Sequence, residues 1–296
     1  MSGTDPDAAQ ALPLLDTHAH IWSRARTPQP WIEPATMAPL DRDFDVTDLA
    51  AAQRAAGITE GAVLVQSAHD PAETGDLLAA VDGLVVRGVV GWVDLRADLD
   101  LQLESWGPDA RHLVGVRHLA HQDPDPWALL ADERRRSFAA LAGHELPVDL
   151  VLRPEQLRPV GVELARRHPG TLLVLDHLGN PPLADEQAFA GWRRALAEFA
   201  AHPNTTVKLS GIALHAADHA DPESMRDAVD HALGCFGAER TMFGSDWPVV
   251  ELAGGARTWT STVRALTQQL SRSERRAVFS EVGRRIYRLG GRRAAP

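Results

Sequence analysis

Residues Leu172-Leu173-Val174-Leu175-Asp176-His177 carry the pattern that decides the fold of this chain. The four apolar residues follow one another without alternation, which predicts a strand that is buried on both faces. Such strands are typical of a parallel sheet covered by helices on both sides. Asp176 and His177 then end the apolar run at the carboxyl end of the strand, where parallel sheets bind their ligands.

Other segments of the same kind recur at regular intervals along the 296 residues. The strands that they predict, the first included, span residues 12–21, 61–67, 85–93, 113–119, 147–152, 171–177, 205–210 and 240–246. Between the strands, apolar residues recur at helical spacing. The predicted helices span residues 46–56, 72–81, 99–106, 127–142, 155–167, 188–201, 222–236, 259–270 and 274–287. We expect Gly57 and Gly143 to cap two of them and Ser273 to open the last.

This alternation of strands and helices, without a break in composition, indicates one parallel α/β domain. A (β/α)8 TIM barrel is the expected fold, since such barrels take about 250 residues. A doubly wound open sheet is the alternative, but no Gly-x-Gly-x-x-Gly loop follows the first strand, so we expect no nucleotide cofactor. The barrel should span residues 12–290, between a disordered tail at 1–11 and a C-terminal tail at 291–296.

Composition excludes several classes of partner. The net charge of −10 argues against binding to nucleic acid or to an anionic membrane. Cys235 is the only cysteine, so no internal disulfide can form and a reducing compartment is expected. The first ten residues do not resemble a signal peptide, and no apolar run reaches the ~20 residues of a membrane span. We expect a cytoplasmic enzyme with a small-molecule substrate, and a homo-oligomer is compatible with the sequence.

Two histidines end the first predicted strand, within Asp16-Thr17-His18-Ala19-His20-Ile21-Trp22. Residues two apart in a strand point the same way, so His18 and His20 should converge. Neighbouring neutral imidazoles can hold a divalent metal or polarise a substrate oxygen. The pair alone is equally compatible with two unrelated histidines, so the other strand ends decide between these interpretations.

Nearly every other strand also ends in a group that can bind a proton, a metal or an anion. In a (β/α)8 barrel these ends meet at one rim, where the active site lies. The groups at or just after them are Gln66, Ser67, His69, Trp92, Asp94, Arg117, His118, Arg153, Asp176, His177, Lys208, Ser210 and Asp246. So many polar groups predict a catalytic pocket, and we expect the long loop 28–39, which carries Trp31, to cover its mouth.

Four of these residues are assigned roles from their chemistry. Asp246 is the expected general base for a water molecule, or else a helix N-cap, and His177 would face the same centre. Arg117 suits a carboxylate or an oxyanion, with an ion pair to Asp94 or another rim carboxylate as the alternative. Lys208, the only lysine among 30 basic residues, is either an anion binder or an ion-pair partner of Asp246 or Asp176.

Taken together, these residues resemble the amidohydrolase superfamily, and within it the amidohydrolase-2 group that includes sugar-lactone and pyrone-dicarboxylate lactonases. The matching segments are residues 16–22, 115–117, 175–179, 208–211 and 243–248. The resemblance implies a distorted (β/α)8 barrel that opens a sugar-acid or carboxylated lactone. It implies that Asp246 activates water, that His18, His20 and His177 form the centre with it, and that Arg117 binds the substrate carbonyl or carboxylate.

The resemblance also bears on metal content. Many superfamily members carry a carboxylated lysine on strand four that bridges two metals, and this chain has Arg117 and His118 there. We therefore expect either one divalent metal, Zn2+ on this donor set of His18, His20, His177 and Asp246, or none. The expected substrate-binding residues are Arg117, Lys208, Gln66, Trp92 and Arg153. The alternatives are a metal-dependent decarboxylase of the same superfamily and a non-catalytic barrel that binds sugar acids.

Overall fold

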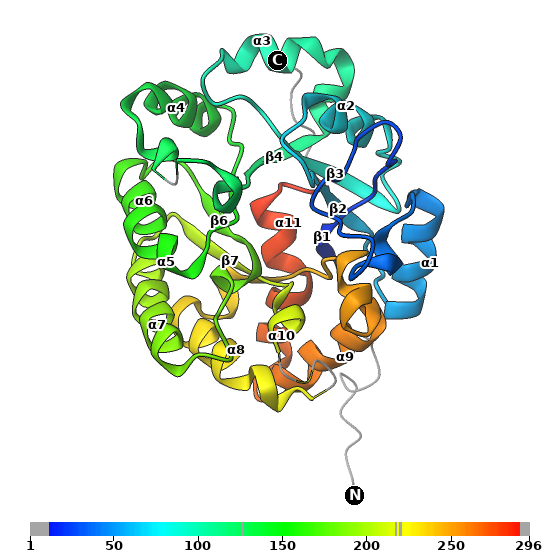
Figure 1. The fold of residues 1–296 in the computed structure, drawn as a ribbon, viewed down its shortest axis with the longest axis vertical. Coiled ribbons are helices and arrows are strands. Elements are labelled where there is room, and N and C mark those ends of the chain that lie inside the picture. The colour runs from blue at the N-terminus through cyan, green and yellow to red at the C-terminus, as the bar shows by residue number, and fades with distance from the viewer. Residues whose placement is uncertain (1–11, 126, 217, 219–220, 291–296) are drawn as a thin grey trace, which may run out of the picture.

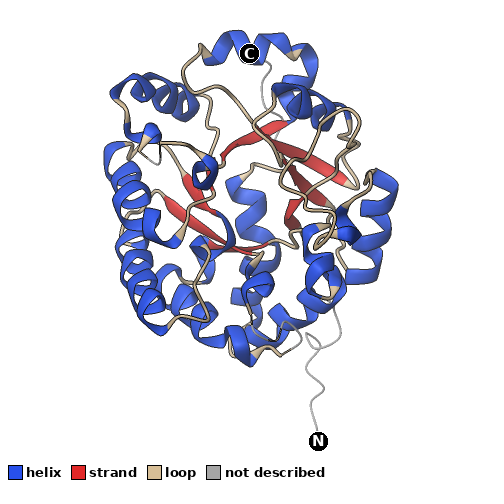
Figure 2. Cartoon of the chain, in the orientation of Figure 1, coloured by secondary structure: helices blue, strands red, loops and turns tan. Residues whose placement is uncertain are grey.

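The computed structural model describes residues 12–125, 127–216, 218 and 221–290, and the two predicted tails fall outside this range. Eight strands form one sheet in the order β1 to β8, and every neighbouring pair is parallel. A parallel bridge between Ala19 and Trp247 joins the end of β8 to β1. Helices surround the ring of strands (Figures 1 and 2). The predicted (β/α)8 barrel is confirmed.

All eight predicted strands exist, and each is shorter than its predicted segment. Their bounds are β1 Asp16–Ala19, β2 Ala62–Val65, β3 Val86–Gly91, β4 Leu113–His118, β5 Val148–Leu150, β6 Leu173–Leu175, β7 Thr205–Leu209 and β8 Thr241–Phe243. The predicted segments are longer because burial continues beyond the hydrogen-bonded ladder. Leu14 and Leu15, for example, are buried but precede β1.

The helices lie close to the predicted ranges. Their bounds are α1 Val46–Ala56, α2 Pro71–Ala79, α3 Leu99–Ser105, α4 Arg135–Gly143, α5 Pro154–Gln156, α6 Glu163–Arg167, α7 Glu186–Ala200, α8 Glu223–Phe236, α9 Gly255–Leu266, α10 Arg272–Arg276 and α11 Val282–Ile286. The π-helical turns Leu157–Val162 and Ala277–Glu281 join α5 to α6 and α10 to α11, so each pair forms one helix as predicted.

Several predicted helix boundaries are wrong. The predicted helix 259–270 begins and ends four residues earlier, as α9. The segment 127–142 does not begin as a helix, because Ala131 is extended (ψ 138°) and separates two short 3-10 turns before α4. Gly143 is the last residue of α4 rather than a left-handed cap, and Glu145 takes the positive φ of 55° instead. Ser271, not Ser273, caps α10 through a capping box with Glu274. The cap at Gly57 is confirmed, with φ 72°.

Apolar side chains fill the interior of the barrel at the end where the C-terminal helix packs. Val63 and Val65 of β2 point inward and pack with the C-terminal helix, while Ala62 and Leu64 pack outward against the surrounding helices. Figure 1 shows α11 at the centre of the ring of strands. Because α11 closes one end, the polar residues at the carboxyl ends of the strands surround the other. Among the described residues, no helix has the length and apolar character needed to cross a bilayer.

Candidate active site

A cavity of about 720 Å³ opens at the carboxyl ends of the strands. Trp31 and Met37 from the loop after β1 form part of its wall, which confirms that this loop lies over the barrel mouth. Aliphatic residues and prolines complete the wall. The polar groups that line the cavity are His20, Ser67, Arg117, His121, Gln122, Arg153, His177, Asn180, Asp185, His215 and Asp246.

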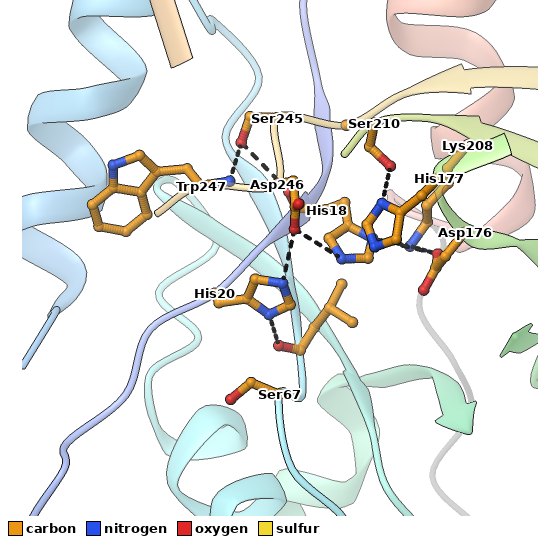
Figure 3. Close-up of polar contacts among 12 residues, drawn as sticks. His18, His20, Ser67, Asp176, His177, Lys208, Ser210, Ser245, Asp246 and Trp247 are labelled. Atoms are coloured by element: carbon orange, nitrogen blue, oxygen red, sulfur yellow. Dashed lines mark hydrogen bonds and ion pairs between the residues drawn. The ribbon is translucent and has the colours of Figure 1, made fainter. Parts of the chain in front are cut away.

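His18 and His20 converge as the strand spacing predicts. Their rings meet edge to face, with centroids 4.9 Å apart. His20 Nδ1 lies 2.7 Å from the carbonyl oxygen of Val65, which can only accept, so Nδ1 carries a proton. His20 Nε2 then points at Asp246 Oδ1 at 3.3 Å, and His18 Nε2 lies 3.6 Å from the same oxygen (Figure 3). One carboxylate oxygen therefore faces both imidazoles.

Asp246 is held on the turn after β8 by its backbone. Its φ of 59° is left-handed, and its N–H donates to the carbonyl oxygen of His18 at 2.7 Å. The side chain caps no helix, because the following 3-10 helix Val249–Ala253 has Pro248 at its N-cap. Burial raises the pKa of Asp246, but His177, His20 and His18 outweigh this and hold the pKa well below its usual value. The carboxylate is therefore ionised at neutral pH, as a general base requires.

Asp16 ties the histidine strand to the turn that carries Asp246, a role that sequence reasoning missed. Its Oδ1 accepts hydrogen bonds from the N–H groups of His18 (3.0 Å) and Ser245 (2.8 Å), and its Oδ2 accepts from the Ser245 hydroxyl (2.5 Å). Burial raises the pKa of Asp16 to about 6 although these hydrogen bonds lower it. The only signal in the sequence is the position of Asp16 directly before the histidine pair.

Arg117 crosses the floor of the cavity from β4. Its Nε donates to Asp176 Oδ2 at 2.8 Å and its Nη1 to the carbonyl oxygen of Gln66 at 2.8 Å. Nη2 faces the centre, 3.4 Å from the Nε2 atoms of both His18 and His177. The guanidinium therefore has an ion pair with a rim carboxylate, and it also presents one nitrogen to the reacting groups. Asp94, the other partner considered, pairs with Arg96.

Lys208 lies beneath this floor and is completely buried. Its ammonium contacts Asp149 Oδ2 at 2.5 Å, Asp176 Oδ1 at 3.2 Å and His18 Nδ1 at 3.1 Å. Tyr287, from the C-terminal end of the chain, donates its hydroxyl to Asp149 at 2.8 Å. Of the two ion pairs considered from the sequence, the one with Asp176 is present and none forms with Asp246. The sequence did not predict a role for Asp149, because one aspartate within a short apolar strand does not indicate which residue it pairs with.

The five predicted substrate-binding residues divide into those that line the cavity and those that do not. Arg117 and Arg153 line the cavity, whereas Gln66, Trp92 and Lys208 do not. Gln66 instead donates to the carbonyl oxygen of Arg117 at 3.2 Å, and the Trp92 ring packs near His69 at 5.9 Å. The cavity also contains His121 and His215, which sequence reasoning missed because they lie in short 3-10 turns without a repeating pattern.

His177 reaches the centre because the turn after β6 is left-handed, with φ 56° at this residue. Its Nδ1 lies 3.0 Å from the hydroxyl of Ser210. Gly211 leaves the space that the ring occupies: a Cβ there would lie 2.3 Å from His177 Nδ1. The imidazole is therefore positioned by Ser210 and by the space that Gly211 leaves.

We expect Gly211→Ala to displace His177 and to lower kcat by about 10- to 100-fold. Gly211 has φ 68°, which costs an alanine about 1–2 kcal/mol, and the added methyl group overlaps the imidazole. Steady-state kinetics and thermal unfolding measure the two effects. Gly234→Ala is the matched control, because no atom lies within 4 Å of the added Cβ. Unchanged kcat in a folded Gly211→Ala protein would contradict the expectation that turnover depends on the position of His177.

The donor atoms of the site fit a divalent metal. Two groups of buried residues bring three ligand atoms within 4.8 Å of one another: His18, His20 and Asp246, and His18, Asp176 and His177. The first group has a further reason to bind a cation. In its neutral form, with the proton on Nδ1, His20 presents a lone pair at Nε2 to Asp246 Oδ1 at 3.3 Å, and two acceptors so close need a proton or a cation between them.

Comparisons with known proteins find a matching family and several similar proteins. A family model described as amidohydrolase matches residues 15–289. A protein of Burkholderia multivorans named L-fucono-1,5-lactonase is 35% identical over 288 residues, covering 93% of this chain and 96% of that protein. One of the same name from Burkholderia ambifaria is 34% identical over 242 residues, covering 81% and 82%. A solved amidohydrolase from Burkholderia multivorans with bound zinc superposes with a TM-score of 0.86 at 33% identity, covering 94% and 99%.

Proposed function

The chain belongs to the amidohydrolase family, and on that premise we propose that it is a lactonase that hydrolyses the ring ester of a sugar-acid lactone. The observation that carries the proposal is the Asp246 carboxylate, which is buried and ionised and lies within 3.6 Å of both His18 and His20 on the cavity floor. The two relatives named L-fucono-1,5-lactonase support the same reaction.

The proposed mechanism uses Asp246 as the base. Asp246 takes a proton from a water molecule whose oxygen attacks the lactone carbonyl carbon, giving a tetrahedral intermediate with a negative oxygen. Arg117 Nη2, which points toward the histidines, donates to this oxygen and stabilises its charge. The bond between the carbonyl carbon and the ring oxygen then breaks. Asp246 returns the proton to the ring oxygen, and the product is the open hydroxy acid.

Charges around the cavity favour a neutral lactone over one that bears further carboxylates. Two of the three Arg117 nitrogens already bind Asp176 and Gln66, and Arg153 is bound to the carbonyl oxygen of His121. Asp185 and Asp246 add negative charge to the lining. Burial lowers the pKa of His121 to about 4, so this imidazole is neutral at pH 7. A polyhydroxylated sugar lactone suits such a lining better than a dicarboxylate.

We further propose that the divalent metal is zinc, held by His18, His20 and Asp246, with His177 beside them. When bound, the ion would supply Lewis-acid polarisation of the substrate oxygen. Imidazole nitrogens and a carboxylate are ligands that Zn2+ prefers. The zinc-bound amidohydrolase of Burkholderia multivorans supports this choice of metal.

The zinc proposal predicts about one equivalent of zinc per chain in protein purified without chelators. His20→Ala removes the Nε2 donor, and we expect it to weaken zinc binding by at least about 10²-fold, since each ligand contributes several kcal/mol. Elemental analysis and competition with a fluorescent chelator measure content and affinity without relying on turnover. His144→Ala, which removes a half-buried imidazole paired with Asp100 outside the cavity, is the control. Equal zinc affinity in the two variants would contradict the site.

A panel of sugar-acid lactones in weakly buffered pH indicator tests the proposed activity. Each ring opening releases one proton, so we expect rapid acidification with at least one aldonolactone and slower or no reaction with carboxylated lactones. Aromatic acids in the same panel, with carbon dioxide measured, cover the decarboxylase alternative. Carbon dioxide release without acidification by any lactone would contradict the proposal, and binding without any turnover would indicate a non-catalytic barrel.

A further inference from the structure

The indole of Trp31 forms part of the cavity wall close to the histidines. Trp31 contacts Trp22 edge to face, with centroids 5.7 Å apart, and the Trp22 ring lies 6.4 Å from that of His20. Trp31 is half-buried and lines the same cavity as His20 and Asp246. A ligand whose reacting carbon lies at Asp246 therefore occupies a cavity that has Trp31 in its wall.

Trp31 is fixed by a hydrogen bond on the side away from solvent. Its Nε1 donates to Gln29 Oε1 at 2.8 Å, and the Gln29 side chain is 1% exposed. The same Gln29 oxygen lies 3.0 Å from the Ser67 hydroxyl at the end of β2. The only polar atom of the indole is therefore already paired, and the ring offers apolar surface to the cavity.

Glu73 of α2 holds the other end of this chain of contacts. Its carboxylate is 2% exposed and accepts from the backbone N–H groups of Ser67 (3.0 Å) and Ala68 (2.8 Å), and it also binds the Ser67 hydroxyl. The backbone of Ser67 is thus held to α2, the Gln29 oxygen lies beside the Ser67 hydroxyl, and Trp31 donates to Gln29. Two buried contacts and one partly buried hydrogen bond therefore fix the position of the Trp31 ring.

We propose that Trp31 is the specificity-determining residue on which the sugar ring of the lactone packs, and that Gln29 is the positioning residue that holds it. The inference rests on the proposed lactonase function. One face of a sugar lactone consists of C–H groups, which pack on an aromatic surface, while its hydroxyl groups point to the polar side of the cavity. The aromatic wall would then act on substrate binding rather than on the chemical step.

Four variants test this on the lactone that the wild type hydrolyses fastest. Trp31→Ala should raise KM about 10- to 100-fold with kcat within about threefold, because it removes a contact made equally in the ground state and the transition state. Trp31→Phe keeps a ring but loses the N–H, and Gln29→Met loses the acceptor. Each should raise KM about 2- to 10-fold. Both changes break the hydrogen bond between Trp31 and Gln29, so their effects on KM in the double variant should be less than additive.

Trp127→Ala is the matched control, because Trp127 is 51% exposed and does not line the cavity. Thermal unfolding checks that each protein is folded. If Trp31→Ala does not fold, Trp31→Phe and Gln29→Met test the proposal in its place. Lactone hydrolysis with unchanged KM in the Trp31 variants overturns the packing role, and additive effects in the double variant overturn the role of Gln29. Failure of the wild type to open any lactone overturns the proposed function, and this inference falls with it.

Discussion

Asp246→Asn is expected to lower kcat by about 10³-fold or more while the fold is kept. General bases contribute about 10²- to 10⁴-fold to a rate, and here the same carboxylate also returns the proton to the leaving oxygen. Asparagine is close in shape to aspartate and tolerates the left-handed φ of 59° at this position. The backbone hydrogen bond from residue 246 to His18 needs no side chain, so it is retained.

Turnover of the variant is measured with the pH-indicator assay, and folding with thermal unfolding and near-UV circular dichroism. Asp45→Asn is the matched control, because Asp45 caps α1 and asparagine caps a helix equally well. We expect wild-type kcat for this control. A folded Asp246→Asn protein that retains more than about a tenth of the wild-type kcat would show that another group activates the water.

The architecture and the centre of the site were predictable because they depend on local patterns. Continuous apolar runs such as 172–175 specify strands buried on both faces, and the barrel then brings all polar strand ends to one rim. The spacing of His18 and His20 placed both imidazoles on one side of a strand. The structure brings this pair together with His177 and Asp246, although the three segments are far apart in the sequence.

The sequence did not reveal the ion pairs and hydrogen bonds that join distant segments. Lys208 was predicted as an anion binder or as an ion-pair partner of Asp246 or Asp176, but its position beneath the floor depends on Asp149 and on Tyr287, the residue after α11. Asp16 and Glu73 act through backbone N–H groups, which leave no trace in residue type. Helix boundaries failed for a related reason, since at Ala131 one extended residue overrides an apolar periodicity that reads as helical.

Lys208→Met is expected to lower the free energy of unfolding by about 3–5 kcal/mol, the usual cost of leaving a buried charge without its partner. Asp149 and Asp176 are both completely buried and share this one ammonium group. At roughly 2 °C per kcal/mol for a chain of this length, Tm should fall by about 6–10 °C. Arg96→Ala, which breaks the exposed pair with Asp94, should cost less than about 1 kcal/mol.

The stability that Lys208→Met loses should depend on pH, and the ionisation of Asp149 determines whether the loss grows or shrinks as the pH rises. Burial raises the pKa of Asp149, and in the wild type Lys208 opposes this rise. Without the ammonium the folded-state pKa rises further above the unfolded value, and a raised acid costs stability as the pH increases through that window. The difference in Tm between wild type and Lys208→Met should therefore be larger at pH 8 than at pH 5. Adding Asp149→Asn should recover part of the loss at pH 8, and equal losses at both pH values would contradict a buried charge as the cause.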